Sequence, residues 1–303
     1  MGKKYSWFGI CLLTILSLIW GFAWPVMKVV LTEVPPFTFR LYCMLFSGVG
    51  FILLIKIKGL SLKIPKKDIN PILLVSFLHI TLWYILSAFA IANMGAGRAS
   101  IIAYTMPLWA AVLSIYFLNE KLRPRRIVGL SLGIAGIAIL MGPDIIVFKS
   151  STIGAFLMLC AAISWGAGIV AIKAHKWSIP TIVLSCWSVI IGGIPLAIGA
   201  IITETSSVFA PVSLRCVLAL FYVVLLGNII SYWAWYKVIN IFPVTVASIG
   251  TLMIPIIGVF SSTLILGEQV GFREIVSLIL VVSALVIVLI LPEVSLDRSD
   301  KIS

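Results

Sequence analysis

Residues 99–120 read ASIIAYTMPLWAAVLSIYFLNE, and residues 247–268 read ASIGTLMIPIIGVFSSTLILGE. Each segment is mostly apolar over about 20 residues, which is the length that an α-helix needs to cross the hydrocarbon core of a bilayer. At an offset of 148 residues, Ala99, Ser100, Ile101, Pro107, Ser114, Leu118 and Glu120 recur as Ala247, Ser248, Ile249, Pro255, Ser262, Leu266 and Glu268. The chain is therefore predicted to be a membrane protein that contains an internal repeat.

The repeat extends beyond these two segments. Trp20, Gly21, Lys28 and Pro35 recur 145 residues later as Trp165, Gly166, Lys173 and Pro180, and Tyr84 recurs as Tyr232 at an offset of 148. Chance agreement is the alternative, because apolar stretches draw on few residue types, but the matches include Trp, Pro and Glu at fixed offsets. We expect a first repeat over residues 1–145, a second over 150–293 and a cytoplasmic tail over 294–303.

The composition is also that of a membrane protein. Of the 303 residues, 62% are hydrophobic and 11% are charged, and the mean hydropathy is +1.21, whereas soluble domains are about half apolar and a quarter charged. The predicted fold is an all-α integral membrane protein with ten transmembrane helices. The ten apolar runs cover residues 8–30, 37–55, 71–92, 99–118, 126–142, 153–172, 180–202, 214–236, 244–266 and 273–291.

The basic residues predict how the chain crosses the membrane. With a cytoplasmic N-terminus, sixteen Lys and Arg residues fall on the inner side and six on the outer side, and an excess of Lys and Arg marks the cytoplasm. Both termini are then cytoplasmic. Because each repeat has five spans, the second is inverted relative to the first, an architecture that many secondary transporters share. The first run resembles a signal peptide, but the bulky Trp20 and Trp24 near the expected cleavage site indicate an uncleaved helix.

The net charge of +12 does not indicate nucleic-acid binding, because the basic residues lie in short loops between apolar runs. Five cysteines without a CxxC pair, together with two histidines, predict neither a disulfide framework nor a metal site. No cofactor is expected. The expected partners are the lipid bilayer and a small-molecule substrate, and short loops favour a multi-pass protein of a bacterial inner membrane.

Several segments resemble the EamA-type family of the drug/metabolite transporter superfamily. They are Ile-Trp-Gly-Phe (19–22), Gly-Arg-Ala-Ser (97–100), Met-Pro-Leu-Trp (106–109) and Leu-Asn-Glu-Lys-Leu (118–122), with Ile-Pro (254–255) and Leu-Gly-Glu (266–268) repeating the signature. The resemblance implies ten helices around a central cavity and transport of amino acids or other small metabolites, often outward. It implies no particular substrate.

Aromatic and polar residues within the spans are candidates for a substrate cavity. Trp20, Trp24 and Trp165 lie near mid-span, whereas interfacial tryptophans lie at the membrane surfaces; core packing is the alternative. Hydroxyl and amide groups can orient a substrate or form interhelical hydrogen bonds. Such groups come from Tyr84, Tyr104, Asn228, Ser231 and Tyr232.

His79 is the histidine that lies well inside a span, and Trp83 follows one helical turn later. An ionisable residue within the membrane is a candidate functional residue, although a neutral histidine hydrogen-bonded across helices is the alternative. No Asp or Glu lies near a predicted midplane. This argues against carboxylate-driven proton coupling and leaves facilitated diffusion, exchange or weak coupling through His79.

Pro107 and Pro255 are candidate hinges, because a proline inside a helix removes one backbone hydrogen bond; a static kink is the alternative. Glu120 and Glu268 end their helices, where a carboxylate needs a cationic or donor partner, and Arg273 is close to Glu268 in sequence. We expect these two glutamates to act as gates or loop anchors. Two further candidates, Arg40 and Arg98, could attract an anionic group or extend to the membrane surface.

Rival functions are a channel, a membrane-embedded enzyme and a structural scaffold. The sequence has no paired membrane carboxylates, no Ser/His/Asp set and no GxxxxGK[ST] loop, so we predict that the protein is not an enzyme. Gly129, Gly133 and Gly136 form a small-residue face that permits close helix contact within the chain or in a homodimer. The predicted function is an exporter or exchanger that works by alternating access around a central cavity.

Overall fold

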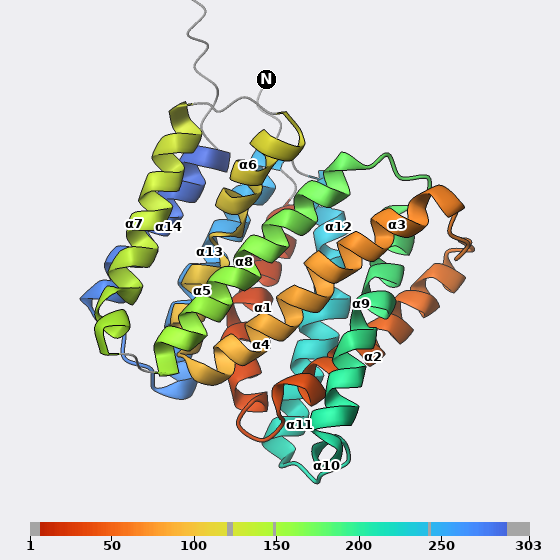
Figure 1. Cartoon of the computed structure of the whole chain (residues 1–303), viewed down its shortest axis with the longest axis horizontal. Helices are drawn as coiled ribbons and strands as arrows, with labels where there is room; N and C mark the ends of the chain where they lie inside the picture. The colour runs from red at the N-terminus through yellow and green to blue at the C-terminus, as the bar shows by residue number, and fades with distance from the viewer. Residues whose placement is uncertain (1–6, 120–123, 148–149, 242–243, 290–303) are drawn as a thin grey trace, which may run out of the picture.

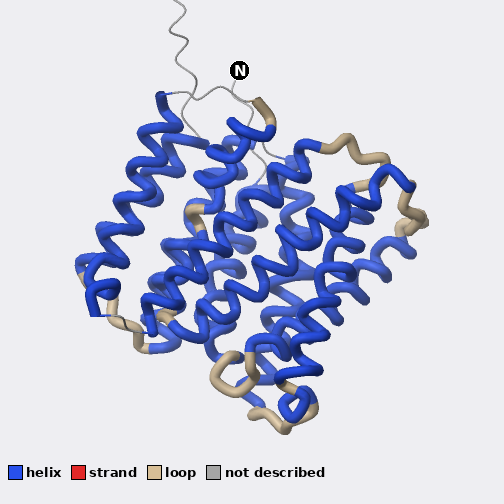
Figure 2. Tube along the Cα trace, viewed as in Figure 1, coloured by secondary structure: helices blue, strands red, loops and turns tan. Residues whose placement is uncertain are grey.

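The computed structural model describes residues 7–119, 124–147, 150–241 and 244–289. All regular secondary structure in these ranges is helical (Figure 2). The elements of the first part of the chain are α1 (Trp7–Val30), α2 (Pro36–Ile57), α3 (Lys66–Val75), η1 (Ser76–Leu82), α4 (Trp83–Asn93), α5 (Ala96–Ala103), α6 (Met106–Phe117) and α7 (Pro124–Val147). Those of the second part are α8 (Ser150–Ala174), α9 (Thr181–Thr203), α10 (Thr205–Val208), α11 (Leu214–Phe221), η2 (Tyr222–Ile230), α12 (Ser231–Ile241), α13 (Val244–Leu266) and α14 (Phe272–Leu289).

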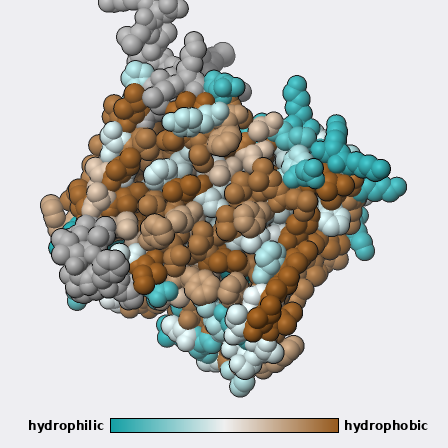
Figure 3. Space-filling model, viewed as in Figure 1, coloured by the Kyte–Doolittle hydropathy of each residue, from teal (hydrophilic) through white to brown (hydrophobic). Residues whose placement is uncertain are grey.

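Many of these helices are long and apolar enough to cross a membrane. Within the described ranges, six meet both criteria, namely Trp7–Val30, Pro36–Ile57, Lys66–Asn93, Ala96–Phe117, Ser151–Ala174 and Thr181–Thr203, and three shorter helices are also apolar. Hydrophobic side chains cover most of the outer face, and hydrophilic side chains gather at its edges (Figure 3). The chain is therefore a multi-pass membrane protein, as the composition predicts.

The main helix contacts join the two parts of the chain. α1 packs along α13, α2 along α9, α7 along α14, and both α4 and α6 pack against α8 (Figure 1). In each pair one helix ends before residue 148 and the other begins at or after residue 150. Each part therefore covers its apolar surface mainly with helices of the other part, rather than with its own.

Close approach of α1 and α13 depends on Gly21. A Cβ atom added at this position would lie 2.3 Å from Cγ2 of Ile257, which is closer than two carbon atoms can pack. The small-residue face of α7 has the same role within the chain. Gly129 and Gly136 lie against Val288 and Val281 of α14, so this face contacts a helix of the same molecule.

Two π-helical segments interrupt the spans, at Ser76–Leu82 and Tyr222–Ile230. Shifted by the repeat offset of 148 residues, the first segment falls on residues 224–230, which lie within the second segment. Neither segment was predicted from the sequence. A π-helical turn leaves backbone carbonyls available for side chains. The hydroxyl of Ser164 in α8 donates to the carbonyl of Leu78 in η1 at 2.5 Å, and Ser231, directly after η2, donates to the carbonyl of Leu226 in η2 at 2.6 Å. Thr81 of η1 in turn donates to the carbonyl of Gly192 in α9 at 2.8 Å.

The two prolines do not have equivalent surroundings. The predicted span 99–118 is broken, because α5 ends at Ala103 and α6 begins at Met106. Pro107 lies in the first turn of α6, where the missing N–H costs no hydrogen bond. Pro255 lies inside α13. A break before Pro107 is therefore found in the first part of the chain, whereas α13 continues through Pro255.

We expect that Gly21→Ala lowers the free energy of unfolding by about 1–3 kcal/mol, because the added methyl group forces α1 away from α13. Gly48→Ala is the matched control, since its added Cβ would have its nearest contact at 3.6 Å. The measurement is thermal unfolding of the purified proteins in detergent, followed by tryptophan fluorescence. Equal melting temperatures for the two variants would contradict this account of the α1–α13 contact.

Candidate functional site

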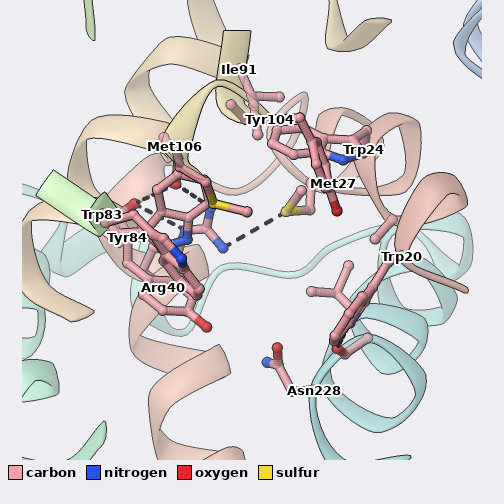
Figure 4. A pocket seen from close by; sticks show the side chains of 16 residues that line it. Trp20, Trp24, Met27, Arg40, Trp83, Tyr84, Ile91, Tyr104, Met106 and Asn228 are labelled. Carbon is pink, nitrogen blue, oxygen red and sulfur yellow. Dashed lines mark hydrogen bonds between the residues drawn. The ribbon is translucent and has the colours of Figure 1, made fainter. Parts of the chain in front are cut away.

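A cavity of about 180 Å³ lies between the two parts of the chain (Figure 4). It is smaller than the ~300–1,000 Å³ typical of sites for drug-sized ligands, so it suits a small molecule. Both parts contribute to its wall. The lining residues are Trp20, Ala23, Trp24 and Met27 of α1, Arg40 of α2, Trp83, Tyr84, Ser87 and Ile91 of α4, Ala103, Tyr104 and Met106 at the α5–α6 break, Trp165 of α8, and Val223, Gly227 and Asn228 of η2.

Most of the wall is aromatic or aliphatic. The rings of Trp83 and Trp165 pack edge to face with centroids 4.8 Å apart, and those of Trp24 and Tyr104 do so at 6.4 Å. The indole N–H of Trp20 donates to the carbonyl of Gly227 at 3.1 Å. Its hydrogen-bonding capacity is therefore used within the wall, and the ring surfaces present an apolar lining to the cavity.

Arg40 supplies a positive charge to this wall. The residue is only 3% exposed, so its side chain is enclosed by neighbouring helices. Nε donates to the carbonyl of Tyr84 at 3.1 Å, Nη2 donates to the hydroxyl of Ser87 at 2.9 Å, and Nη1 lies 3.8 Å from Sδ of Met27. The guanidinium also lies over the rings of Phe39 and Tyr84, at 4.6 and 4.7 Å from their centroids.

Asn228 lies in the cavity wall, and Figure 4 shows its amide beside Trp20. Its Nδ2 donates to the hydroxyl of Ser47 at 3.1 Å, which fixes the orientation of the side chain. Ser231, by contrast, bonds within its own helix and is not part of the wall. The side chain of Tyr232 and the whole of Glu120 lie outside the described residues.

His79 lies behind the cavity wall rather than in it. Its ring stacks on Trp165 with a centroid distance of 3.8 Å, and Trp165 stands between it and the cavity. Its buried Nδ1 has no hydrogen-bond partner in the described part of the chain. His79 can therefore affect a ligand in the cavity by holding the ring of Trp165 in place, and not by lining the cavity itself.

Several cavity residues were not among the sequence candidates, and they include Met27, Ser87, Ile91 and Met106. Helical periodicity carried a signal for some of them. Met27 follows Trp20 by two turns on the same face of α1, and Ser87 and Ile91 follow Tyr84 at spacings of three and seven residues. No such spacing indicated Met106, because its place in the wall depends on the break between α5 and α6.

Glu268 joins the two parts of the chain at one end of the bundle. Its carboxylate accepts hydrogen bonds from the backbone N–H groups of Ala96 and Gly97, at 2.7 and 3.0 Å. A carboxylate at a helix start is favourable, because the first N–H groups of α5 have no partner within the helix. The sequence predicts a cationic or donor partner for Glu268, and the partners are the donors at the start of α5 rather than Arg273, its neighbour in sequence.

Arg98 and Lys28 are held near Glu268. Arg98 forms an ion pair with Glu274 at 2.7 Å. Lys28 donates to the carbonyls of Ile91, Ala92 and Met94 at 2.6, 2.9 and 3.1 Å, which caps the end of α4. Neither residue lies in the wall of the aromatic cavity, so these cations hold loops together at the end of the bundle.

The other carboxylates with described side chains also bond across the two parts. Glu204 accepts from the N–H groups of Phe37 and Thr38 at the start of α2, at 3.2 and 2.7 Å. Asp68 lies 2.7 Å from Nε2 of His175. Glu33 accepts from the N–H and hydroxyl of Ser213, which holds the pKa of Glu33 below its usual range. The Glu33 contact is thus kept at neutral pH and is lost as the carboxylate is protonated in acid.

The model of the EamA-like transporter family matches residues 7–142 and again residues 152–290. The chain belongs to the EamA-like transporter family. Its members are transporters, so the protein is not an enzyme. Within the described residues, no group of three His, Cys, Asp or Glu side chains is placed to hold a metal ion.

Relatives from several bacteria match this family member along most of their length. It is 27% identical to the uncharacterized transporter YoaV of Bacillus subtilis, over 88% of this chain and 91% of the relative. It is 24% identical to a probable amino-acid metabolite efflux pump of Escherichia coli, over 89% and 90%. A solved crystal structure at 19% identity has a TM-score of 0.63 and covers 91% of this chain and 96% of its own, which supports the fold.

We expect that Glu268→Ala destabilises this transporter by about 1–3 kcal/mol, because two charge-assisted hydrogen bonds between the parts are lost. Gln269→Ala is the control, since it changes the neighbouring exposed side chain and leaves the bonds to α5 intact. Thermal unfolding in detergent measures both variants. A Glu268→Ala protein that is as stable as Gln269→Ala would show that the carboxylate does not hold the two parts together.

Proposed function

We propose that the protein is a secondary transporter that moves a small organic metabolite by alternating access around the aromatic cavity. The observation that carries this proposal is the position of the cavity, between two sets of helices that both line it. A rocking motion of one set against the other would expose such a cavity to each side of the membrane in turn. Membership of a transporter family supports the same function.

The proposal includes ten spans in two inverted five-helix repeats, with both termini in the cytoplasm. The coinciding π-helical segments and the two matches to one family model support a duplicated architecture. The repeat offsets relate α1 to α8 and α6 to α13. The contact of α1 with α13 and the contact of α6 with α8 are therefore equivalent in the two repeats, which supports the duplicated architecture. The excess of basic residues on one side supports the orientation.

We further propose export or exchange of the metabolite at a bacterial inner membrane. One relative is named a probable amino-acid metabolite efflux pump, and the relative YedA of Escherichia coli, 26% identical over 90% of this chain, is named an inner membrane transporter. No carboxylate among the described residues lines the cavity. Exchange or facilitated transport is therefore favoured over proton coupling, which requires a group that titrates at the site.

The orientation predicts that a cysteine at Lys63, in the basic link between α2 and α3, is labelled from the cytoplasmic side. A cysteine at Ser206, beside Glu204 and the start of α2, lies at the other end of the bundle and is expected to be labelled from outside. A membrane-impermeant maleimide on right-side-out and inside-out vesicles distinguishes the two sites, with the wild-type protein as background. Labelling of Lys63→Cys from outside would reverse the orientation.

Counterflow in proteoliposomes tests transport itself. We expect saturable accumulation of a labelled metabolite that is stimulated by unlabelled solute inside and is unchanged by a pH gradient, because no titratable carboxylate lines the described cavity. His79→Ala is expected to reduce flux through loss of the support behind Trp165, without creating or removing a pH dependence. Flux that does not saturate would instead indicate a channel, and a gradient dependence lost in His79→Ala would assign proton coupling to His79.

A further inference from the structure

The aromatic cavity carries a buried charge that the packing of the helices does not explain. Arg40 is the charged residue among the described residues of its wall. A guanidinium has five N–H donors. Three hydrogen bonds use one donor on each of its three nitrogens, one of them on a sulfur atom, and the thiol of Cys43 is a further neutral neighbour. Donor capacity therefore remains on the two terminal nitrogens, beside the cavity.

No described carboxylate balances this charge. Glu33, Asp68, Glu204, Glu268 and Glu274 each bond to other groups, at the ends of the helices. Arg40 has neutral acceptors and the faces of two aromatic rings instead. A buried cation within a membrane is costly unless it is paired, so an anion that enters the cavity gains the interaction that the protein leaves unfilled.

The duplicated fold does not require an arginine here. The residue 145 positions later, at the offset that relates Pro35 to Pro180, is Ser185. The hydrogen bonds of Arg40 to α4 could also be made by a neutral donor. The hydrogen bonds that join α2 to α4 do not account for an arginine at this position. Its positive charge therefore needs another explanation.

We propose that this cavity binds small organic anions, with one carboxylate held by Arg40 and an apolar or aromatic body held between the tryptophan rings. A guanidinium and a carboxylate match in geometry and form paired hydrogen bonds. Trp20, Trp24, Trp83 and Trp165 provide flat apolar surfaces for the rest of the ligand. The proposal names the substrate class of the transport site and rests on the transport function proposed above.

The same wall disfavours an added positive charge on the ligand. An ammonium group would find no carboxylate on the described wall and would be repelled by Arg40. Its partners would be the ring faces and neutral oxygens such as the amide oxygen of Asn228. A monocarboxylate without an amino group is therefore expected to bind more tightly than the corresponding amino acid. An amine without a carboxylate is expected to bind weakest.

Four probes that share a phenyl ring and a short chain separate these charges: 3-phenylpropionate, 3-phenylpropionamide, phenylalanine and phenethylamine. Binding to the purified full chain in detergent is measured by isothermal titration calorimetry. We expect 3-phenylpropionate to bind tightest. Arg40→Gln is expected to weaken it by about 10- to 100-fold, the loss typical of a hydrogen-bonded ion pair, while the neutral amide changes by less than about threefold.

Two variants control for charge and folding. Arg215→Gln removes a positive charge from an exposed position at the start of α11 and is expected to leave all four affinities unchanged. Arg40→Lys keeps the charge without the paired donors and is expected to fall between wild type and Arg40→Gln. If Arg40→Gln does not fold, the order of the four probes on the wild-type protein and the effect of Arg40→Lys still decide the question.

The proposal is overturned if the wild-type protein binds the amide or the amine as tightly as 3-phenylpropionate, or if Arg40→Gln weakens the acid and the amide equally. Phenylalanine binding more tightly than 3-phenylpropionate would show that the tryptophan faces select an ammonium group instead. Failure of transport is a separate result. Anion binding with no counterflow would contradict the transport function alone, whereas counterflow of another solute without selective anion binding would contradict the ligand class alone.

Discussion

Hydrogen bonds that carboxylates of one part of the chain accept from groups of the other are the interaction on which this arrangement depends. Lipid tails are as apolar as the helix surfaces, so burial of apolar side chains gives little net drive for two sets of helices to associate in a bilayer. Glu204 and Glu268 satisfy N–H groups at the starts of α2 and α5, which otherwise lack partners. These bonds fix the ends of the bundle, and close packing at Gly21 and Gly129 joins α1 to α13 and α7 to α14 along its length.

The use of carboxylates at the ends has a consequence for the middle of the molecule. The described acidic side chains bond to partners at the ends of the helices, and the described wall of the cavity contains no acidic side chain. Arg40 then determines the electrostatic character of the cavity, because no described group of opposite sign lies beside it. The site is thus apolar in shape and cationic in charge, a combination that the overall charge of +12 does not reveal.

The sequence predicted the helical membrane fold, because that depends on composition and on the length of the apolar runs. Trp20, Trp24 and Trp165 line the cavity, and their contact with a substrate stays a prediction. The sequence did not predict that Arg40 is buried in the cavity wall, because this burial depends on how α2 packs against α4. The π-helical segments were also missed, because side-chain contacts with other helices, such as Thr81 with Gly192, stabilise them. His79 lies behind the wall because η1 turns it onto Trp165.

The two parts of the chain share a pattern but differ where the cavity is formed. Arg40 has a serine at the equivalent position, and the break before Pro107 has no equivalent at Pro255. Arg40 of α2 donates hydrogen bonds to Tyr84 and Ser87 of α4, so α2 and α4 together form the charged side of the wall. Trp165 and η2 form the opposite side. A ligand anchored on Arg40 would therefore contact α2 and α4 of the first part through its charged end, while Trp165 and η2 of the second part would contact the rest of it.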